Sequence, residues 1–188
     1  MLLPRPASGC PYLILAPMEG VGDAHFRKAL LKIGGFDEAV RDFIRVPRNC
    51  HVQSLAEVYD AEELSPTLLA PQIMGGDPEL MAVMACELVR RGAHRIDINC
   101  GCPSNTVNGR GAGASLLRDT SLLFSVVKAV SSAVTVPVTV KMRSGYHDTL
   151  SFRENIKAVE DAGAAYITLH PRTKVEGYKG AACWELIA

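Results

Sequence analysis

HRIDIN at residues 94–99 and VPVTVKM at residues 136–142 both read as strands, and the second is rich in β-branched residues. Between them, apolar residues recur three or four positions apart from Leu122 to Val130, which predicts a helix with one apolar face. Asp119 precedes this pattern and can cap the free N–H groups of the first turn. A strand, a helix and a second strand in this order indicate a parallel sheet.

The same alternation continues on both sides of this stretch. AYITLH at residues 165–170 predicts a strand, and Ser151 with Glu154 forms a capping box, S-x-x-E, for the helix before it. On the N-terminal side, TLLAPQIM at residues 67–74 predicts a strand, and Asp77 caps the helix that follows.

The first part of the chain follows the same order. YLILA at residues 12–16 predicts the first strand, and residues 39–46 predict the second. The helix between them carries Phe26, Leu30 and Ile33 on one apolar face. The whole chain therefore contains about six strands that alternate with helices.

Two architectures accommodate this pattern, an open doubly wound sheet and a (β/α)₈ barrel. The first strand is not followed by G-x-G-x-x-G, which disfavours a dinucleotide-binding Rossmann fold. Barrel enzymes place catalytic groups at the carboxyl ends of several strands. Polar residues occupy such positions here, namely Glu19, Gln72, Asn99, Lys141 and His170. We therefore predict an α/β fold, a TIM (β/α)₈-type barrel.

Eight strands and roughly 250 residues are typical of a complete barrel. The 188 residues of this chain supply about six βα units. We therefore expect residues 1–188 to form one incomplete barrel domain, truncated after about six units, with no second domain.

Composition limits the partners of the chain. Lys+Arg and Asp+Glu balance at 20 each, which argues against RNA binding by charge alone. Arg172 follows a strand of the predicted active face and is the better candidate for contact with RNA phosphates. No apolar run approaches the roughly 20 residues that span a membrane. The six cysteines match no zinc-site spacing, so we expect no metal and a cytoplasmic chain with reduced thiols.

Cys102 has the context of a reactive thiol. It lies just after a strand, between Gly101 and Pro103, and is therefore placed over the predicted active face. An unperturbed thiol has a pKa of about 8.5, so it is mostly protonated at neutral pH and can donate a proton. The alternative is an inert buried cysteine, which is the common role of this residue.

Four motifs carry a resemblance to a known family. They are APMEGV at residues 16–21, NCGCPS at residues 99–104, VKMR at residues 140–143 and HPRT at residues 170–173. In this order and spacing they resemble the tRNA-dihydrouridine synthases, and the first two variants are most similar to the bacterial C-type subfamily. The resemblance extends from about residue 12 to the end of the chain.

The resemblance implies reduction of a uridine in the D-loop of tRNA to 5,6-dihydrouridine, with FMN as the cofactor and NADPH or NADH as the reductant. It implies that Cys102 protonates the uracil ring. It also implies that flavin is held by Pro17, Met18, Glu19, Gln72, Lys141 and His170, and that substrate is contacted by Asn99 and Arg45. By the same resemblance, a helical C-terminal tRNA-binding domain is absent here, and the full-length enzyme is a monomer.

Several of these positions have a physical rationale and a simpler alternative. Lys141 could stabilise negative charge on reduced flavin, or it could extend to water. Gln72 could pair with the flavin edge, or it could bond the backbone at a strand end. His170 could be a satisfied core histidine. Two other functions also remain open, an FMN barrel oxidoreductase acting on a small molecule and a non-catalytic truncated remnant.

Overall fold

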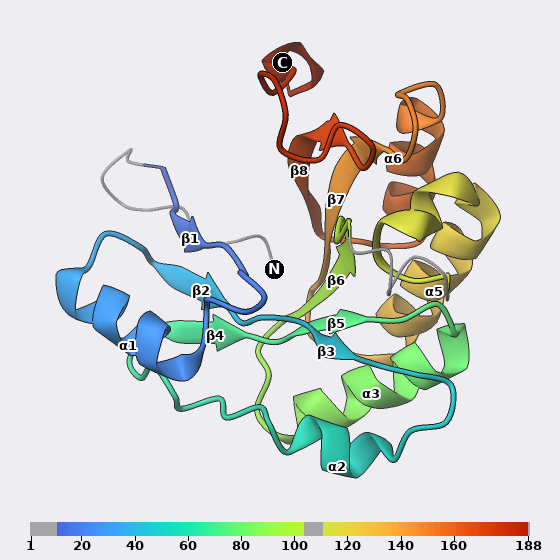
Figure 1. The fold of residues 1–188 in the computed structure, drawn as a ribbon. Coiled ribbons are helices and arrows are strands. Elements are labelled where there is room, and N and C mark those ends of the chain that lie inside the picture. Colours follow the sequence, from blue (N-terminus) through green and yellow to red (C-terminus); the bar gives the residue numbers. More distant parts are fainter. Residues whose placement is uncertain (1–10, 104–110, 188) are drawn as a thin grey trace.

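The computed structural model describes residues 11–103 and 111–187, and its strands form two parallel sheets (Figure 1). The smaller sheet has the order β1 (Ile14–Leu15), β2 (Glu38–Val40) and β4 (Leu68–Ala70). The larger sheet has the order β3 (Ile44–Arg45), β5 (Gln72–Met74), β6 (Ile96–Cys100), β7 (Val138–Gly145) and β8 (Tyr166–Thr173). Every paired neighbour is parallel.

Helices follow the strands in chain order. They are α1 (Ala24–Ile33), α2 (Val52–Ala56), α3 (Pro78–Arg90), α5 (Thr120–Ala133) and α6 (Phe152–Asp161), with 3₁₀ helices η1 (Gly113–Arg118) and η2 (Trp184–Leu186). Figure 1 shows α3, α5 and α6 along the outer side of the larger sheet. None of the helices in the described residues is long and apolar enough to cross a membrane.

The strands form a partial TIM-type barrel that is open between its first and last strands. β1 and β8 stand at the ends of the strand order and do not pair with each other. They face each other across a small cavity of about 190 Å³, lined by Ile14 and Ala16 on one side and by Tyr166 and Thr168 on the other. The structure has eight strands, but two of the predicted strands are each divided into two short ones. Counting each divided strand once gives six βα units, as predicted.

Residues 67–74 were predicted as one strand, and the division falls at Pro71. Ala70 pairs with Val40 of β2, whereas Gln72 pairs with Asp97 of β6. On its other edge β5 pairs with β3, the continuation of β2, through Ile73 and Ile44. Proline has no N–H to donate to a neighbouring strand, so the ladder is interrupted at Pro71. The predicted strand at residues 39–46 is likewise divided into β2 and β3, which belong to different sheets.

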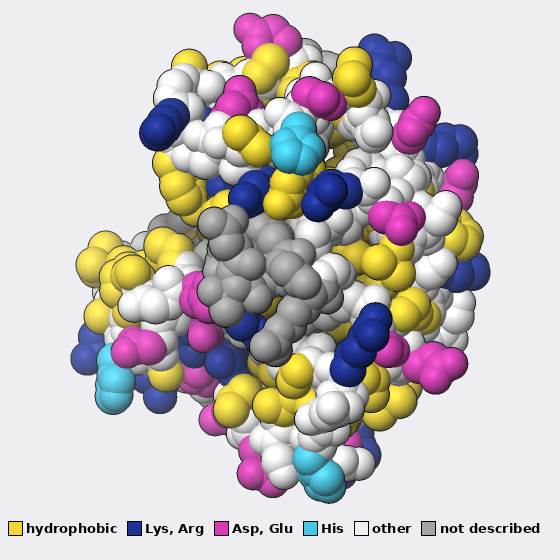
Figure 2. Space-filling view, turned by 45° about the vertical axis from the view of Figure 1, so that its right-hand side comes forward, with side chains coloured by type: hydrophobic (Ala, Val, Ile, Leu, Met, Phe, Trp, Pro, Cys, Tyr) yellow, Lys and Arg dark blue, Asp and Glu magenta, His cyan; other side chains and the backbone are white. Residues whose placement is uncertain are grey.

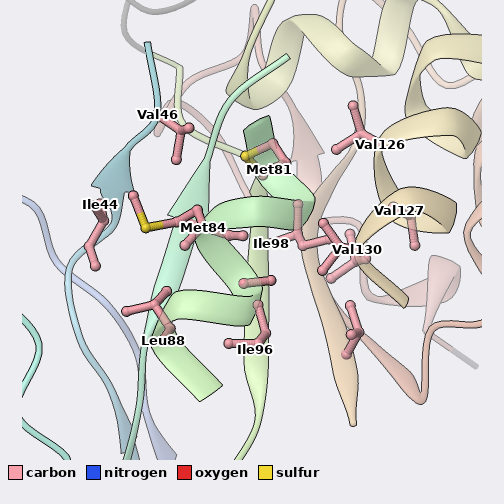
Figure 3. Packing of buried hydrophobic residues seen from close by; sticks show 14 of the residues in the cluster. Ile44, Val46, Met81, Met84, Leu88, Ile96, Ile98, Val126, Val127 and Val130 are labelled. Atoms are coloured by element: carbon pink, nitrogen blue, oxygen red, sulfur yellow. The ribbon is translucent and has the colours of Figure 1, made fainter. Parts of the chain in front are cut away.

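The core lies between the larger sheet and its helices. Side chains alternate along a strand, and Ile96, Ile98 and Cys100 of β6 are all buried on the helix side. Figure 3 shows Ile96 and Ile98 with Leu88 of α3 and Val130 of α5, in the single large cluster of buried hydrophobic residues. The opposite face of the same strands is therefore the inner face of the barrel.

The predicted apolar face of α1 is wrong at one end. Ile33 is 81% exposed, whereas Arg27 is buried. The Arg27 guanidinium donates to both carboxylate oxygens of Glu63, at 2.7 and 2.8 Å, and to the carbonyl of Gly22. An ion pair with good geometry thus takes the inward position, which hydrophobic periodicity alone does not reveal.

The helix N-termini differ in how they are capped. Asp77 and Asp119 accept hydrogen bonds from the third residue after each, at 3.1 and 3.0 Å, as predicted. The predicted capping box at Ser151 is wrong, because its side chain makes no capping hydrogen bond and its backbone has φ −86° and ψ 10°. That φ/ψ pair is outside the extended conformation that an N-cap residue usually adopts.

These caps provide a matched test. We expect Asp119→Ala to lower the free energy of unfolding by about 1 kcal/mol, because one N–H of α5 loses its partner. Ser151→Ala should change it by less than about 0.5 kcal/mol. Urea denaturation followed by circular dichroism measures both, and equal losses in the two variants would contradict the assignment.

Candidate active site

The register of the central strands sets polar side chains beside one another. Asn99 of β6 lies opposite Lys141 of β7, and Arg143 of β7 lies opposite His170 of β8. All four belong to the inner face, because the residues that alternate with them pack against the helices. They stand near the carboxyl ends of parallel strands, where barrel enzymes carry their active sites.

A cavity of about 570 Å³ opens at these strand ends. This volume is in the range of pockets for small molecules and cofactors. Strands, strand ends and loops from along the whole chain contribute to it. The lining residues are Pro17, Met18, Glu19, Phe43, Gln72, Asn99, Gly101, Cys102, Pro103, Lys141, Arg143, His170 and Tyr178.

Eight of the ten site residues predicted from the sequence line this one cavity. The two exceptions are Arg45 and Arg172. Arg45 lies near the cavity rim, 3.8 Å from the carboxylate of Glu19. Arg172 lies behind His170, where one guanidinium nitrogen is 3.2 Å from Nε2 of that ring and another donates to the carbonyl of Gly180.

A chain of hydrogen bonds runs beneath the cavity and ends on a buried carboxylate. Asn99 Nδ2 donates to Gln72 Oε1 at 2.8 Å, and Gln72 Nε2 donates to Asp97 Oδ2 at 2.6 Å. Thr139 Oγ1 donates to the other oxygen of Asp97. Because a carboxylate only accepts, Asp97 fixes which way each amide is turned.

The last link of this chain holds the loop that carries Cys102. The fixed orientation of Asn99 turns its Oδ1 toward the loop, where it accepts from the backbone N–H groups of Gly101 and Cys102 at 3.0 and 2.9 Å. The thiol of Cys102 therefore stands at the cavity on a loop that is bonded to the barrel interior. Cys100, two residues earlier, is buried on the helix side, and burial raises the pKa of its thiol.

The cavity has an excess of positive charge. Lys141 and Arg143 line it, and Glu19 is the one carboxylate among the lining residues. Burial lowers the pKa of Lys141, while Asp97 beneath it acts in the opposite direction. Burial also raises the pKa of Asp97. Two cations that share one small cavity favour a ligand with anionic or electron-rich oxygen atoms.

His170 is neutral at physiological pH. Burial, together with the nearby charges of Arg143, Lys141 and Arg172, lowers its pKa to about 4. The Arg172 guanidinium contains only donors, so Nε2 of His170 accepts from it and the ring proton resides on Nδ1. The site thus holds one neutral imidazole of fixed tautomer.

Sequence reasoning gave no role to three lining residues, Arg143, Tyr178 and Phe43. Arg143 had a detectable signal, because it follows Lys141 by two positions and so shares its strand face. Tyr178 is in a loop after β8, and no periodicity points to it.

Residues 104–110, which include Ser104 of the NCGCPS motif, lie outside the described residues. Within the described part of the chain, no group of three His, Cys, Asp or Glu side chains is placed to hold a metal ion.

The fold and the cavity define a TIM-type α/β barrel protein with its site at the carboxyl ends of the strands. Solved structures share this architecture: the carboxyl transferase domain from Rhizobium etli pyruvate carboxylase with pyruvate has a TM-score of 0.60 at 16% identity, and covers 93% of this chain and 32% of that one. This likeness concerns the fold alone.

The sequence model of dihydrouridine synthase matches residues 14–188, and the chain belongs to this family. It is 41% identical to a tRNA-dihydrouridine(16) synthase of Neisseria meningitidis serogroup B, over 93% of this chain and 55% of the relative. It is 43% identical to the protein of the same name from Pseudomonas syringae pv. tomato, over 94% of this chain and 58% of the relative. The chain thus spans little more than half the length of these relatives, and the predicted family is confirmed.

The hydrogen-bond chain predicts the cost of altering Asp97. In Asp97→Asn, one oxygen becomes an NH₂ donor that faces either Gln72 Nε2, which also donates, or the guanidinium of Arg95, which lies 3.5 Å from Asp97 Oδ1. We expect a loss of about 1–3 kcal/mol in the free energy of unfolding, which is typical of an unsatisfied buried polar group. Asp161→Asn, at an exposed ion pair with Lys157, is the control and should cost less than about 1 kcal/mol. Equal effects in urea denaturation would refute the role of Asp97.

The lowered pKa of His170 predicts a pH dependence. The folded state should titrate with a pKa of about 4, whereas an unfolded histidine titrates near 6.5. As pH falls from about 6.5 to 4, His170 is protonated in the unfolded state but stays neutral in the folded state. The free energy of unfolding therefore decreases in this window. His170→Gln should lack this component. Nitrogen-15 NMR of the ring measures the pKa directly, and a midpoint above 6 would contradict the assignment.

Proposed function

We propose that the protein reduces the uridine at position 16 of tRNA to 5,6-dihydrouridine, with FMN as cofactor and NADPH or NADH as reductant. The observation that carries the proposal is the single cavity that brings Cys102 together with Gln72, Asn99, Lys141 and His170. The position in tRNA follows the name of the relatives, tRNA-dihydrouridine(16) synthase. Membership of the dihydrouridine synthase family supports the reaction.

The residues present fit a flavin. Gln72 uses one donor and one acceptor of its amide within the protein, so one of each is left for a ring edge that both donates and accepts. Pro17 and Met18 offer an apolar surface at the end of β1. Lys141 and Arg143 add positive charge without a facing carboxylate other than Glu19, which suits a cofactor that becomes electron-rich on reduction.

Reduction of uridine adds a hydride and a proton across the double bond between carbons 5 and 6. When bound in the cavity, the flavin supplies the hydride to carbon 6. Cys102 supplies the proton to carbon 5, and the thiolate left behind takes a proton from solvent. The donor has to stay in reach while the substrate changes, and the Asn99 side chain provides this by holding the loop at two N–H groups.

Neutral His170 and cationic Lys141 have separate roles in this proposal. Lys141 favours negative charge that develops on the ring system. His170 is uncharged, so it can donate a hydrogen bond from Nδ1 without adding a third positive charge next to Arg143 and Arg172.

Residues 1–188 carry no excess of basic side chains. The chain has no net charge, and on the face shown in Figure 2 basic and acidic side chains are interspersed. The target base has to leave its stack to enter the cavity. In this proposal Arg45, 3.8 Å from the cavity-lining Glu19, contacts the phosphate backbone. Arg172, predicted to contact RNA phosphates, also donates a hydrogen bond to His170 and so supports that ring.

The test is dihydrouridine at position 16 in tRNA from a host that lacks its own synthases and expresses the natural gene. We expect the modification with the wild-type gene and a loss of about 10²-fold or more in rate with Cys102→Ala. Cys100→Ala is the matched control and should retain activity, because Cys100 is buried on the helix side. A flavin-containing wild-type protein that leaves the tRNA unmodified would instead favour a small-molecule reductase.

A further inference from the structure

Arg143 is buried to an unusual degree for a charged residue at a cavity. It is 1% exposed, and its guanidinium donates to three backbone carbonyls. Nε donates to Gly101 at 2.9 Å, and one terminal nitrogen donates to Thr173 at 3.0 Å and to Gly177 at 2.9 Å. The three acceptors belong to the loop after β6 and to the end of β8 with the turn that follows it, two segments that are far apart in the sequence.

Both segments carry residues that line the cavity. Gly101 immediately precedes Cys102, and the turn at residues 173–177 leads into Tyr178. The guanidinium of Arg143 also lies 5.3 Å from the ring centre of Tyr178, and that ring is 6.0 Å from the ring of His170. One side chain of β7 thus connects the loop of the thiol to the segment on the other side of the cavity.

Arg143 differs from the other deeply buried arginines in its partners. Arg27 pairs with Glu63, and Arg95 pairs with Glu38. Among the described residues, no carboxylate forms an ion pair with Arg143, and burial lowers its pKa. Glu176 of the following turn is close enough for the charges of Arg172 and Arg143 to contribute to its lowered pKa, after its hydrogen bonds to Thr173. Burying a cation without an ion-pair partner costs stability. A buried arginine without an ion-pair partner does not stabilise the barrel core. Its position beside the cavity therefore indicates that Arg143 serves to hold the surrounding backbone in place.

We propose that Arg143 is a positioning residue that fixes the distance between the Cys102 loop and the segment at residues 173–178. The proposal deepens the proposed function, because the loop it holds is the one that presents the proton donor. The role depends on the planar fork of the guanidinium, which reaches carbonyls in two directions at once. A lysine keeps the charge but lacks this fork.

The experiment compares Arg143→Lys and Arg143→Met with wild type by amide hydrogen exchange. We expect exchange at Gly101, Cys102 and residues 174–179 to accelerate together, on the order of tenfold, in both variants. Leu88→Ala is the control for general destabilisation, because it removes a buried side chain from the far end of α3. It should not accelerate these two segments selectively.

A kinetic measurement accompanies the exchange. In both Arg143 variants we expect kcat for dihydrouridine formation to fall by about 10²-fold, with KM for tRNA changed by less than about threefold, since the donor is misplaced and binding is retained. Exchange requires no activity, so the positioning role is tested even if the wild type forms no dihydrouridine. That second result would count against the proposed function alone.

Three outcomes would overturn the proposal. One is wild-type exchange in Arg143→Lys, which would show that charge suffices. The second is acceleration of one segment without the other. The third is equal acceleration in Leu88→Ala. If neither Arg143 variant folds, native-state hydrogen exchange of the wild type in low denaturant is the test. The two segments should then open with the same free energy. Different opening free energies would exclude the coupling.

Discussion

The organisation of the site depends on the hydrogen bonds that the buried carboxylate of Asp97 accepts. It accepts from Gln72 and Thr139, so it determines the orientation of the Gln72 amide, then that of Asn99, and finally the acceptor offered to the loop of Cys102. Each step follows because an amide has one accepting and one donating end. A reversal anywhere along this chain would turn an NH₂ group toward the loop N–H groups and release the thiol from its place.

The strand register makes this arrangement possible. Asp97 pairs with Thr139, and Asn99 pairs with Lys141, so polar side chains of neighbouring strands meet in layers on the inner face. A slip of one residue would bring the isoleucines of β6 inside and set the carboxylate against the helices. Burial of the apolar outer face therefore fixes the strand register, and the register in turn determines which polar side chains meet on the inner face. Arg95, which donates to Thr139 and to Glu38, continues the network below Asp97 and leaves few buried polar groups unpaired.

The sequence predicts elements whose patterns are local, and it fails where partners come from elsewhere in the chain. The strand at residues 94–99 and the caps at Asp77 and Asp119 follow from neighbours within a few positions, and the structure contains them. The burial of Arg27 depends on Glu63, 36 residues away. The same limit applies to the site, because strand ends could be located from the sequence, whereas Tyr178 and the three acceptors of Arg143 became evident only with the loops in place.

Cys100 and Cys102 show how the fold distinguishes two similar residues. Both belong to the same motif, and their two-residue spacing would place them on the same face of a continuing strand. β6 ends at Cys100, which is still buried on the helix side, while the turn held by Asn99 reverses the direction of the next side chains. Cys102 consequently lines the cavity. A proton donor has to be accessible to substrate and to recover its proton from water, and a thiol enclosed between β6 and the helices can do neither. The end of one strand, together with two hydrogen bonds to Asn99, thus separates a structural cysteine from the one that the proposed chemistry requires.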